Sequence, residues 1–232
     1  LPRVLKEAFF IARTGRPGPV VIDVAKDVFD AKVDYAYPET VHLRGYSGRY
    51  PGSEAEIDAV VEAVAEARRP LLFVGGGVIG ADQAEAVRSI VTQLGAPVTS
   101  TLLGLGAVAA DAEGFLGFAG MHGSYAANMA IQGCDLLLCI GMGFSDRVTG
   151  IVSGFAPKAR VVHFEIDEAE VNKNVRADYH VAGDLRWSLP RFQEKLAQRG
   201  VDYAAANREW LQQTMAKTKE HPFSYRPDGD VI

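Results

Sequence analysis

The stretch Leu71-Leu-Phe-Val-Gly-Gly-Gly-Val-Ile-Gly80 is the part of this sequence that most directly indicates a fold. Its first four residues form a short continuous apolar run, which is typical of a buried strand. The glycines that follow match the pattern G-x-G-x-x-G, placed between that strand and an expected helix. Glycines in this context let the backbone approach the diphosphate of a dinucleotide.

Three interpretations of this glycine turn stay open. A standard NAD site also needs an acidic residue about 20 residues further on, at the end of the second strand. The second expected strand ends in Thr99-Ser-Thr101 and is followed by Leu102, so that acid is missing. The other two interpretations are a dinucleotide bound in a different geometry and a glycine turn needed only for packing. The missing acid favours both of them over NAD.

The alternation of strand and helix continues along the chain. Apolar runs and helical spacing predict strands at 98–101, 136–140, 160–166 and near 180–182, and helices within 81–94, near 124–132, at 185–198 and at 203–217. Short apolar strands separated by helices are typical of a parallel sheet covered on both faces. The sequence therefore predicts an α/β, doubly wound (Rossmann-like) domain.

Composition also divides the chain into parts. The first part of the chain looks like the tail of a preceding domain. It has helical spacing at 4–12, a break at Thr14-Gly-Arg-Pro-Gly-Pro19 and a strand-like run at 20–24. Tyrosines among prolines and glycines without regular spacing suit a linker. Since the chain opens in mid-helix without methionine, we expect a fragment of a longer protein. The expected parts are a domain tail at 1–28, a linker at 29–53, the sheet domain at 54–189 and a helical linker at 190–232.

Composition and charge argue against several classes of partner. The formal net charge is −5 over 232 residues, and Lys and Arg are scattered singly, so no basic face for nucleic acid is expected. The apolar runs are far shorter than the roughly 18 residues that a membrane-spanning helix needs, so no membrane insertion is expected. Cys134 and Cys139 are expected to be buried free thiols, which fits a reducing cytoplasm. The histidines and cysteines predict no catalytic triad and no metal site.

Carboxylates follow two of the later strands. Glu165 and Asp184 stand at strand ends, where they could accept hydrogen bonds from a ribose or an adenine at the same sheet edge as the glycine turn. Asp167 could do the same, but it also precedes a run that suits a helix start, so it could be an N-cap. Both roles can hold at once.

Three further charged or polar side chains are candidates. His122 lies in a loop before a helix, where an imidazole can stack on a ring system or simply be a structural residue. Arg16 and Arg147 stand just after an expected helix or strand ends, where a charged side chain could point into a cleft. Arg147 and its neighbour Asp146 could equally be a solvated surface pair.

Four motifs, in this order, resemble those of one enzyme family: Arg16-Pro-Gly-Pro-Val20, Gly75-Gly-Gly77, Gly120-Met-His-Gly123 and Gly141-Met-Gly-Phe-Ser-Asp-Arg-Val-Thr-Gly150. They look like the central domain of acetolactate synthase (acetohydroxyacid synthase) large, catalytic subunits, and the resemblance runs from about Leu1 to Leu189. It implies a six-stranded parallel sheet that binds FAD in an extended form. It also implies that the domain tail belongs to a pyrimidine-binding domain and that the last linker leads to a diphosphate-binding domain.

The resemblance also implies site residues. It places the substrate channel at Met121, Asp146 and Arg147, and it implies no catalytic residue within this chain. The flavin contacts that it implies are Arg16, Gly75, Gly76, Gly77, Thr101, Leu102, Gly120, Met121, His122, Gly141, Met142, Glu165, Ile166, Gly183 and Asp184.

The chain departs from the family pattern beside the fourth motif's first glycine. Gly143 stands where the family has an arginine, and Ser145 stands where it has an aspartate. Each lost charge-assisted hydrogen bond is worth roughly 1.5 to 3 kcal/mol. The departures therefore imply that FAD binds this chain weakly or not at all. Glu165 replaces an aspartate and keeps the acceptor.

For the longer protein, the resemblance implies a transferase of branched-chain amino-acid biosynthesis. It would condense two pyruvates, or pyruvate and 2-oxobutyrate, using thiamine diphosphate, Mg²⁺ and FAD, as a homodimer or tetramer with or without a regulatory subunit. This chain alone is expected to be inactive. The alternatives are a thiamine-diphosphate enzyme of the pyruvate oxidase type, which uses FAD, or of the oxalyl-CoA decarboxylase type, which binds ADP, and a non-catalytic nucleotide-binding module. The stretch Asp146-Arg-Val-Thr-Gly150 favours acetolactate synthase over the other two enzymes.

Overall fold

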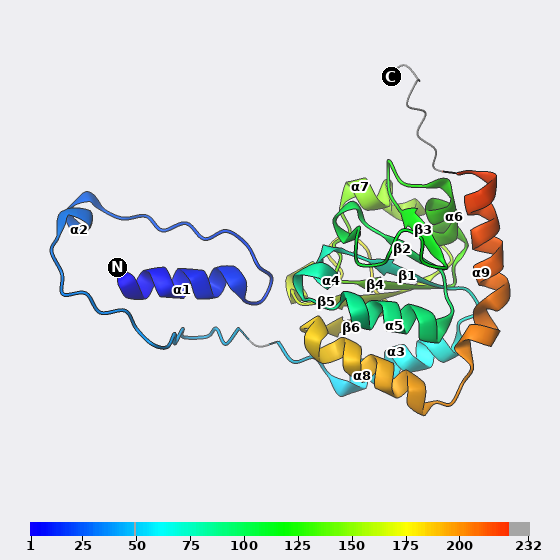
Figure 1. Cartoon of the computed structure of the whole chain (residues 1–232), viewed down its shortest axis with the longest axis horizontal. Helices are drawn as coiled ribbons and strands as arrows, with labels where there is room; N and C mark the ends of the chain where they lie inside the picture. Colours follow the sequence, from blue (N-terminus) through cyan, green and yellow to red (C-terminus); the bar gives the residue numbers. More distant parts are fainter. Residues whose placement is uncertain (49, 223–232) are drawn as a thin grey trace, which may run out of the picture. The chain divides into compact units, whose positions relative to one another are not determined.

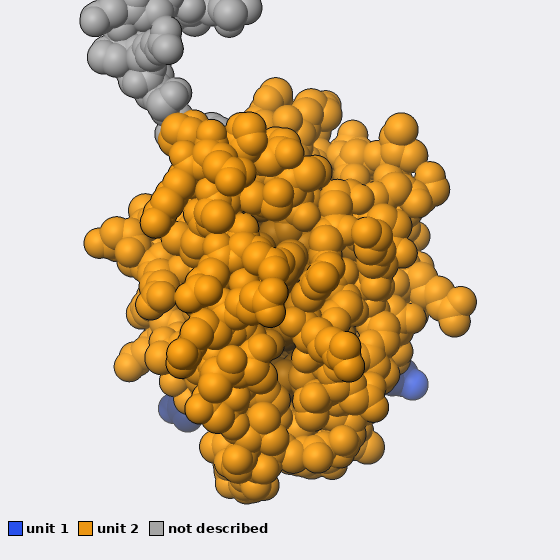
Figure 2. Space-filling view, turned by 90° about the vertical axis from the view of Figure 1, so that its right-hand side faces the viewer, with its two compact units in different colours: residues 1–50 blue, residues 51–232 orange. Residues whose placement is uncertain are grey.

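The computed structural model describes residues 1–48 and 50–222. The chain forms two compact units, unit 1 at Leu1–Tyr50 and unit 2 at Pro51–Ile232 (Figure 1). Unit 2 is one continuous, closely packed body in the space-filling view of Figure 2, where it is orange. The packing of the chain divides it at Tyr50–Pro51, and the finer boundaries stay predictions.

Unit 1 contains the helices α1 (Pro2–Arg13) and α2 (Lys26–Asp30). The Lys6 ammonium donates to the Glu39 carbonyl oxygen at 2.7 Å, which ties α1 to the chain that returns past it. The expected strand at 20–24 is wrong, because no described residue pairs with this run and Val21 is 91% exposed. An apolar run becomes a strand only when a neighbour satisfies its backbone hydrogen bonds.

Unit 2 is built on a sheet of six strands, all parallel, in the order β3-β2-β1-β4-β5-β6. This confirms the predicted α/β, doubly wound, six-stranded parallel sheet. The strands are β1 (Pro70–Val74), β2 (Val98–Ser100), β3 (Phe115–Phe118), β4 (Leu136–Ile140), β5 (Arg160–Glu165) and β6 (Tyr179–Ala182). The sequence patterns missed β3, because it is short, contains Gly117 and shifts register against β2.

Helices connect these strands and cover both faces of the sheet. They are α3 (Glu54–Glu66), α4 (Gly76–Gly80), α5 (Ala84–Leu94), α6 (Tyr125–Gly133), α7 (Asp146–Thr149), α8 (Leu185–Gln198) and α9 (Tyr203–Glu220), with short 3-10 helices η1 (Leu102–Gly104), η2 (Val152–Gly154) and η3 (Glu168–Glu170). In Figure 1, α3, α5 and α8 lie on one side of the sheet and α6 on the other.

Alternate residues of each central strand enter two separate cores. Leu72 and Val74 of β1 belong to the core that contains α3, α5 and α8, whereas Leu71 and Phe73 belong to the core with α6. Successive side chains of a strand point to opposite faces, so a strand covered on both faces must be apolar throughout. This is why β1 and β4 are continuous apolar runs in the sequence.

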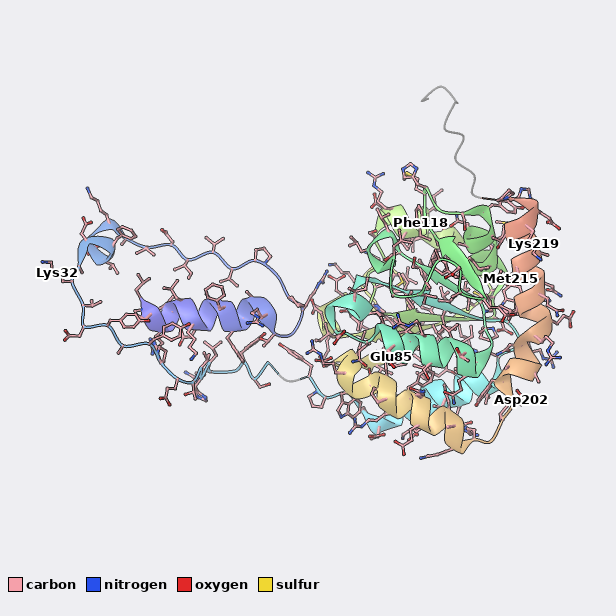
Figure 3. All side chains as sticks on the ribbon, viewed as in Figure 1. Lys32, Glu85, Phe118, Asp202, Met215 and Lys219 are labelled. Carbon is pink, nitrogen blue, oxygen red and sulfur yellow. The ribbon has the colours of Figure 1, made fainter. Side chains whose placement is uncertain are left out.

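The segment 190–222, expected as a helical linker, packs within unit 2. Phe192 of α8 is fully buried in the core, and α9 crosses from the α5 layer to the α6 layer. Trp210 of α9 donates its indole N–H to the carbonyl oxygen of Pro70 at 2.9 Å, where β1 begins. Figure 3 labels Asp202, the N-cap of α9, and Met215 and Lys219 within the helix. This helix therefore packs against the amino-terminal end of β1.

Candidate functional site

The predicted contact residues of unit 2 follow the carboxyl ends of all six strands. Because the strands are parallel, these ends meet at one edge of the sheet, which we call the carboxyl edge. Gly75, Gly76 and Gly77 follow β1, Thr101 and Leu102 follow β2, Gly120, Met121 and His122 follow β3, Gly141 and Met142 follow β4, Glu165 ends β5 and Ile166 follows it, and Gly183 and Asp184 follow β6. Their roles in binding stay predictions.

Arg16 is the one predicted contact that lies in unit 1. It is exposed and follows Gly15, whose φ of 61° places a turn at the end of α1. The site described below is built from unit 2 alone.

The strand order reverses between β1 and β4, and this is where ligands bind in open α/β sheets. Here the two strand exits are joined to each other. The N–H of Gly75 donates to the Ile140 carbonyl oxygen, and the N–H of Gly77 donates to the Gly141 carbonyl oxygen, both at 2.9 Å. A Cβ on Gly75 would lie 2.3 Å from the Gly141 oxygen. The glycine turn therefore packs against the β4 exit, which favours the packing interpretation for Gly75 and Gly77.

Beside the glycine turn, the exit of β2 forms a polar cap and an apolar surface. The Thr101 hydroxyl accepts a hydrogen bond from the N–H of Gly104 at 3.1 Å and so begins η1. The next two side chains, Leu102 and Leu103, are 65% and 79% exposed. These leucines present apolar area to a ligand or to another part of the protein at this edge.

The exits of β3 and β4 are in contact through two predicted channel residues. The N–H of Met121 donates to the Arg147 carbonyl oxygen at 3.0 Å, and the Arg147 guanidinium lies 3.7 Å from the Met121 sulfur. Gly120 has a φ of 111°, and a Cβ there would lie 2.4 Å from the Arg147 carbonyl oxygen. The structure thus brings Met121 and Arg147 together, and His122 is exposed beside them.

Asp146 opens α7 and is exposed at the same edge. Its carboxylate accepts a hydrogen bond from the N–H of Arg147 at 2.9 Å. Among the described residues these two side chains form no ion pair, so Asp146 contacts the backbone of Arg147 rather than its guanidinium. The Arg147 guanidinium therefore lies toward Met121 instead of pairing with Asp146.

The strand-end carboxylates bind their own turns. Glu165 is 8% exposed, and its Oε1 accepts from the N–H groups of Ile166 at 3.0 Å and Asp167 at 3.2 Å. Asp167 accepts from the N–H of Ala169 and caps η3, as the N-cap interpretation expected. Asp184 caps α8 in the same way, through the N–H of Arg186 at 2.9 Å. These backbone contacts therefore use a part of the hydrogen-bonding capacity of each acid, through helix capping for Asp167 and Asp184.

The sequence patterns did not single out His163, which lies inside β5 shortly before the carboxyl end of that strand. It is fully buried in β5, and its Nε2 lies 2.8 Å from the Met142 carbonyl oxygen. Its ring also meets Phe144 edge-on, with ring centroids 4.9 Å apart. Burial lowers the pKa of this imidazole, so it is neutral at pH 7. A polar residue inside an otherwise apolar strand, as in Arg160-Val-Val-His-Phe-Glu165, was the available signal.

The residues at this edge fit a diphosphate group poorly. The N–H groups of Gly75 and Gly77 are already donated to the β4 exit. A side chain at Gly143 would meet the Glu170 carboxylate, whose Oε2 lies 4.0 Å from the Cβ position. That carboxylate is paired with the Lys173 ammonium at 2.6 Å. The N–H groups of Gly75 and Gly77 are thus already hydrogen-bonded, and the carboxylate beside Gly143 is paired with Lys173, so the cation that follows β4 at this edge is Arg147.

Other kinds of site find little support in the part of the chain that the structure describes. Within residues 1–48 and 50–222, no three His, Cys, Asp or Glu side chains are grouped closely enough to hold a metal ion. Over the same residues, no helix combines the length and the apolar character needed to cross a bilayer. Cys134 and Cys139 are buried and free, as expected, and burial raises the pKa of the Cys134 thiol to about 12.

Comparison with known proteins gives consistent matches over the whole chain. The family model described as thiamine pyrophosphate enzyme, central domain, matches residues 57–192. The acetolactate synthase large subunit of Parasynechococcus marenigrum is 42% identical over 234 residues, covering 100% of this chain and 38% of that protein. The acetolactate synthase isozyme 2 large subunit of Escherichia coli is 41% identical over 232 residues, covering 100% of this chain and 40% of that protein. The acetolactate synthase of Mycobacterium leprae is 39% identical over 230 residues, covering 99% and 37%. The chain thus spans about two fifths of the length of the curated relatives that it matches.

Proposed function

Because this chain belongs to the thiamine pyrophosphate enzymes, whose central domain it contains, we propose that it is a segment of an acetolactate synthase large subunit. The observation that carries the proposal is the identity of about 40% to proteins of that name over the full length of the chain. The stretch Asp146-Arg-Val-Thr-Gly150 supports it further, because it favoured this member of the family over its relatives.

The proposed reaction is the condensation of two pyruvates, or of pyruvate and 2-oxobutyrate, to a 2-acetohydroxy acid with release of carbon dioxide. It makes the longer protein a transferase of branched-chain amino-acid biosynthesis. Thiamine diphosphate, held with Mg²⁺, supplies the carbanion chemistry when it is bound. We assign none of the described residues to either group. In this proposal, the chain contributes the carboxyl edge of its sheet, which positions side chains beside the reacting groups.

Arg147 is the side chain that we assign to the incoming 2-oxo acid. Its guanidinium lies at the carboxyl edge against the sulfur of Met121, and Asp146 binds the backbone N–H of Arg147 rather than its charge. A guanidinium binds a carboxylate through two parallel hydrogen bonds, which would orient the acid group of the substrate. Met121 and Asp146 complete the proposed channel.

We propose that FAD binds this chain weakly or not at all. Two observations support this proposal. The N–H groups of Gly75 and Gly77 are already hydrogen-bonded to the β4 exit, and a carboxylate lies beside Gly143. The proposed assembly of the longer protein is a homodimer or tetramer in the cytoplasm of a bacterium, with or without a regulatory subunit. The relatives named large subunits support a second kind of subunit.

The test is an assay of the longer protein with pyruvate, thiamine diphosphate and Mg²⁺, with and without FAD. We expect acetolactate, and a mixed 2-acetohydroxy acid when 2-oxobutyrate is added. Acetaldehyde or acetyl phosphate without acetolactate would contradict the assignment and favour another thiamine enzyme. No turnover of either 2-oxo acid would favour a nucleotide-binding module.

A further inference from the structure

The segment that follows β4, residues 141–147, is held in place by other elements of unit 2. We call it the β4 exit. Three of its carbonyl oxygens accept hydrogen bonds from three different elements: Gly141 from the N–H of Gly77 at 2.9 Å, Met142 from the imidazole of His163 at 2.8 Å, and Phe144 from the side-chain amide of Asn174 at 2.7 Å. Its path therefore depends on partners that lie far away in the sequence.

His163 contacts the β4 exit on both sides of Gly143. Its Nε2 reaches the carbonyl oxygen of Met142, and its ring meets the ring of Phe144. Gly143 itself has no side chain with which to anchor the segment, and it lies on the exposed surface. Met142 and Phe144 are 3% and 4% exposed, so the exit is fixed through these two buried flanks.

The geometry also decides the protonation state of His163. A carbonyl oxygen can only accept, so Nε2 must carry the proton. Nδ1 is buried without a hydrogen-bond partner among the described residues, and a second proton there would have no acceptor. The charged groups nearby are Glu165, whose Oε2 lies 3.7 Å from Nε2, and Glu170, while His180 is the strand neighbour on β6. Burial is the largest effect and lowers the pKa of His163, as does His180, whereas the hydrogen bond to Met142 and the charge of Glu170 raise it.

We infer that His163 is a positioning residue, whose neutral imidazole, with its proton on Nε2, holds the Met142 carbonyl and so fixes the path of the β4 exit. The exit carries Asp146 and Arg147 to the carboxyl edge, so their placement depends on a side chain in the neighbouring strand. This inference goes beyond the proposed function, because it concerns the protein's own hydrogen bond and does not depend on which reaction the longer protein catalyses.

The first test measures the tautomer in the unmodified 232-residue chain. Nitrogen-15 NMR of histidine-labelled protein at pH 7.5 distinguishes a protonated Nε2 from a protonated Nδ1, and the spectrum of His163→Gln identifies the His163 signals. We expect a neutral ring with its proton on Nε2. A proton on Nδ1, or an imidazolium at this pH, would overturn the inference.

The second test measures hydrogen exchange of the β4 exit in three variants, each corrected for its global stability. His163→Leu removes the donor, and we expect exchange about tenfold faster there, the factor that corresponds to one hydrogen bond of about 1.4 kcal/mol. His163→Gln keeps a side-chain N–H, and we expect exchange within about threefold of the unmodified chain. Val161→Ala is the matched control, since it removes apolar contacts from the same strand and the same core but no hydrogen bond. Unchanged exchange in His163→Leu, or an equal increase in Val161→Ala, would overturn the positioning role.

Discussion

The backbone N–H of Gly77 and the carbonyl oxygen of Gly141 form a 2.9 Å hydrogen bond that joins the exits of β1 and β4. A Cβ on Gly77 would lie 2.8 Å from that oxygen. In a dinucleotide-binding sheet this crevice usually receives the diphosphate. In this chain the backbone of the β4 exit lies directly against the glycine turn.

The first prediction concerns the packing of that turn. Gly75→Ala places a Cβ 2.3 Å from the Gly141 oxygen and 2.4 Å from the Met142 Cβ, which forces two backbone segments apart. We expect it to lower the free energy of unfolding by about 1 to 3 kcal/mol or more. Urea denaturation measures the change. Gly80→Ala is the matched control, because its Cβ would meet nothing within 4 Å, and we expect a change of at most about 1 kcal/mol, in the stabilising direction. Equal losses in both variants would contradict the packing interpretation.

The second prediction concerns FAD and the groups beside Gly143. The unmodified chain should purify colourless and bind added FAD weakly or not at all. An arginine introduced by Gly143→Arg begins 4.0 Å from the Glu170 carboxylate and should pair with it, so we expect little gain in affinity. Combining it with Glu170→Gln should free the guanidinium and tighten binding about tenfold or more, as one charge-assisted hydrogen bond would.

Flavin fluorescence during titration measures both affinities. Gly143→Arg combined with Glu168→Gln is the matched control, because it makes the same change in charge on η3 at a side chain that is exposed. A yellow preparation of the unmodified chain with stoichiometric FAD would refute the argument for weak binding. A gain of the same size in the control would show that overall charge, rather than Glu170, sets the affinity.

The third prediction concerns pH. Burial lowers the pKa of His163, so below about 6.5 the unfolded chain binds a proton that the folded chain does not. The stabilising contribution of the neutral imidazole is therefore fully present above about pH 6.5 and is lost as the pH falls. We expect urea unfolding to show a smaller loss of stability between pH 7.5 and 5.5 in His163→Gln than in the unmodified chain. An identical pH dependence in the two proteins would show that His163 is not the titrating group.

The fourth prediction concerns α9. Trp210→Phe removes the N–H that binds the Pro70 carbonyl oxygen and leaves that buried acceptor unsatisfied, which should cost about 1 to 3 kcal/mol of unfolding free energy. Trp187→Phe is the matched control, because Trp187 stacks on Arg191 and no hydrogen bond of its indole N–H is recorded among the described residues. We expect less than about 1 kcal/mol there. Equal costs would mean that ring volume, rather than the hydrogen bond, secures α9 at the start of β1.

Local sequence patterns determined the fold class and the edge of the sheet at which the candidate site residues lie. The continuous apolar runs at β1 and β4 indicated strands covered on both faces, and the alternation with helices indicated parallel order. Parallel order by itself brings the strand ends to one edge, so the residues that follow them could be placed there before their contacts were known. The family resemblance, confirmed by the match over residues 57–192, came from motifs at those same strand ends.

Tertiary structure decided which of these residues engage one another. Nothing local distinguishes a glycine that cradles a phosphate from one that accommodates a backbone, and only the position of Gly141 showed that the backbone of the β4 exit lies against Gly75 and Gly77. The run at 20–24 looks like a strand but has no described partner, and β3 is a strand despite its weak pattern because β2 pairs with it. His163 gave little signal in the sequence, since a buried imidazole becomes informative only when its acceptor, Met142, is known. Strand periodicity is a property of neighbouring residues, whereas hydrogen bonds and close contacts between distant segments exist only once the chain has folded.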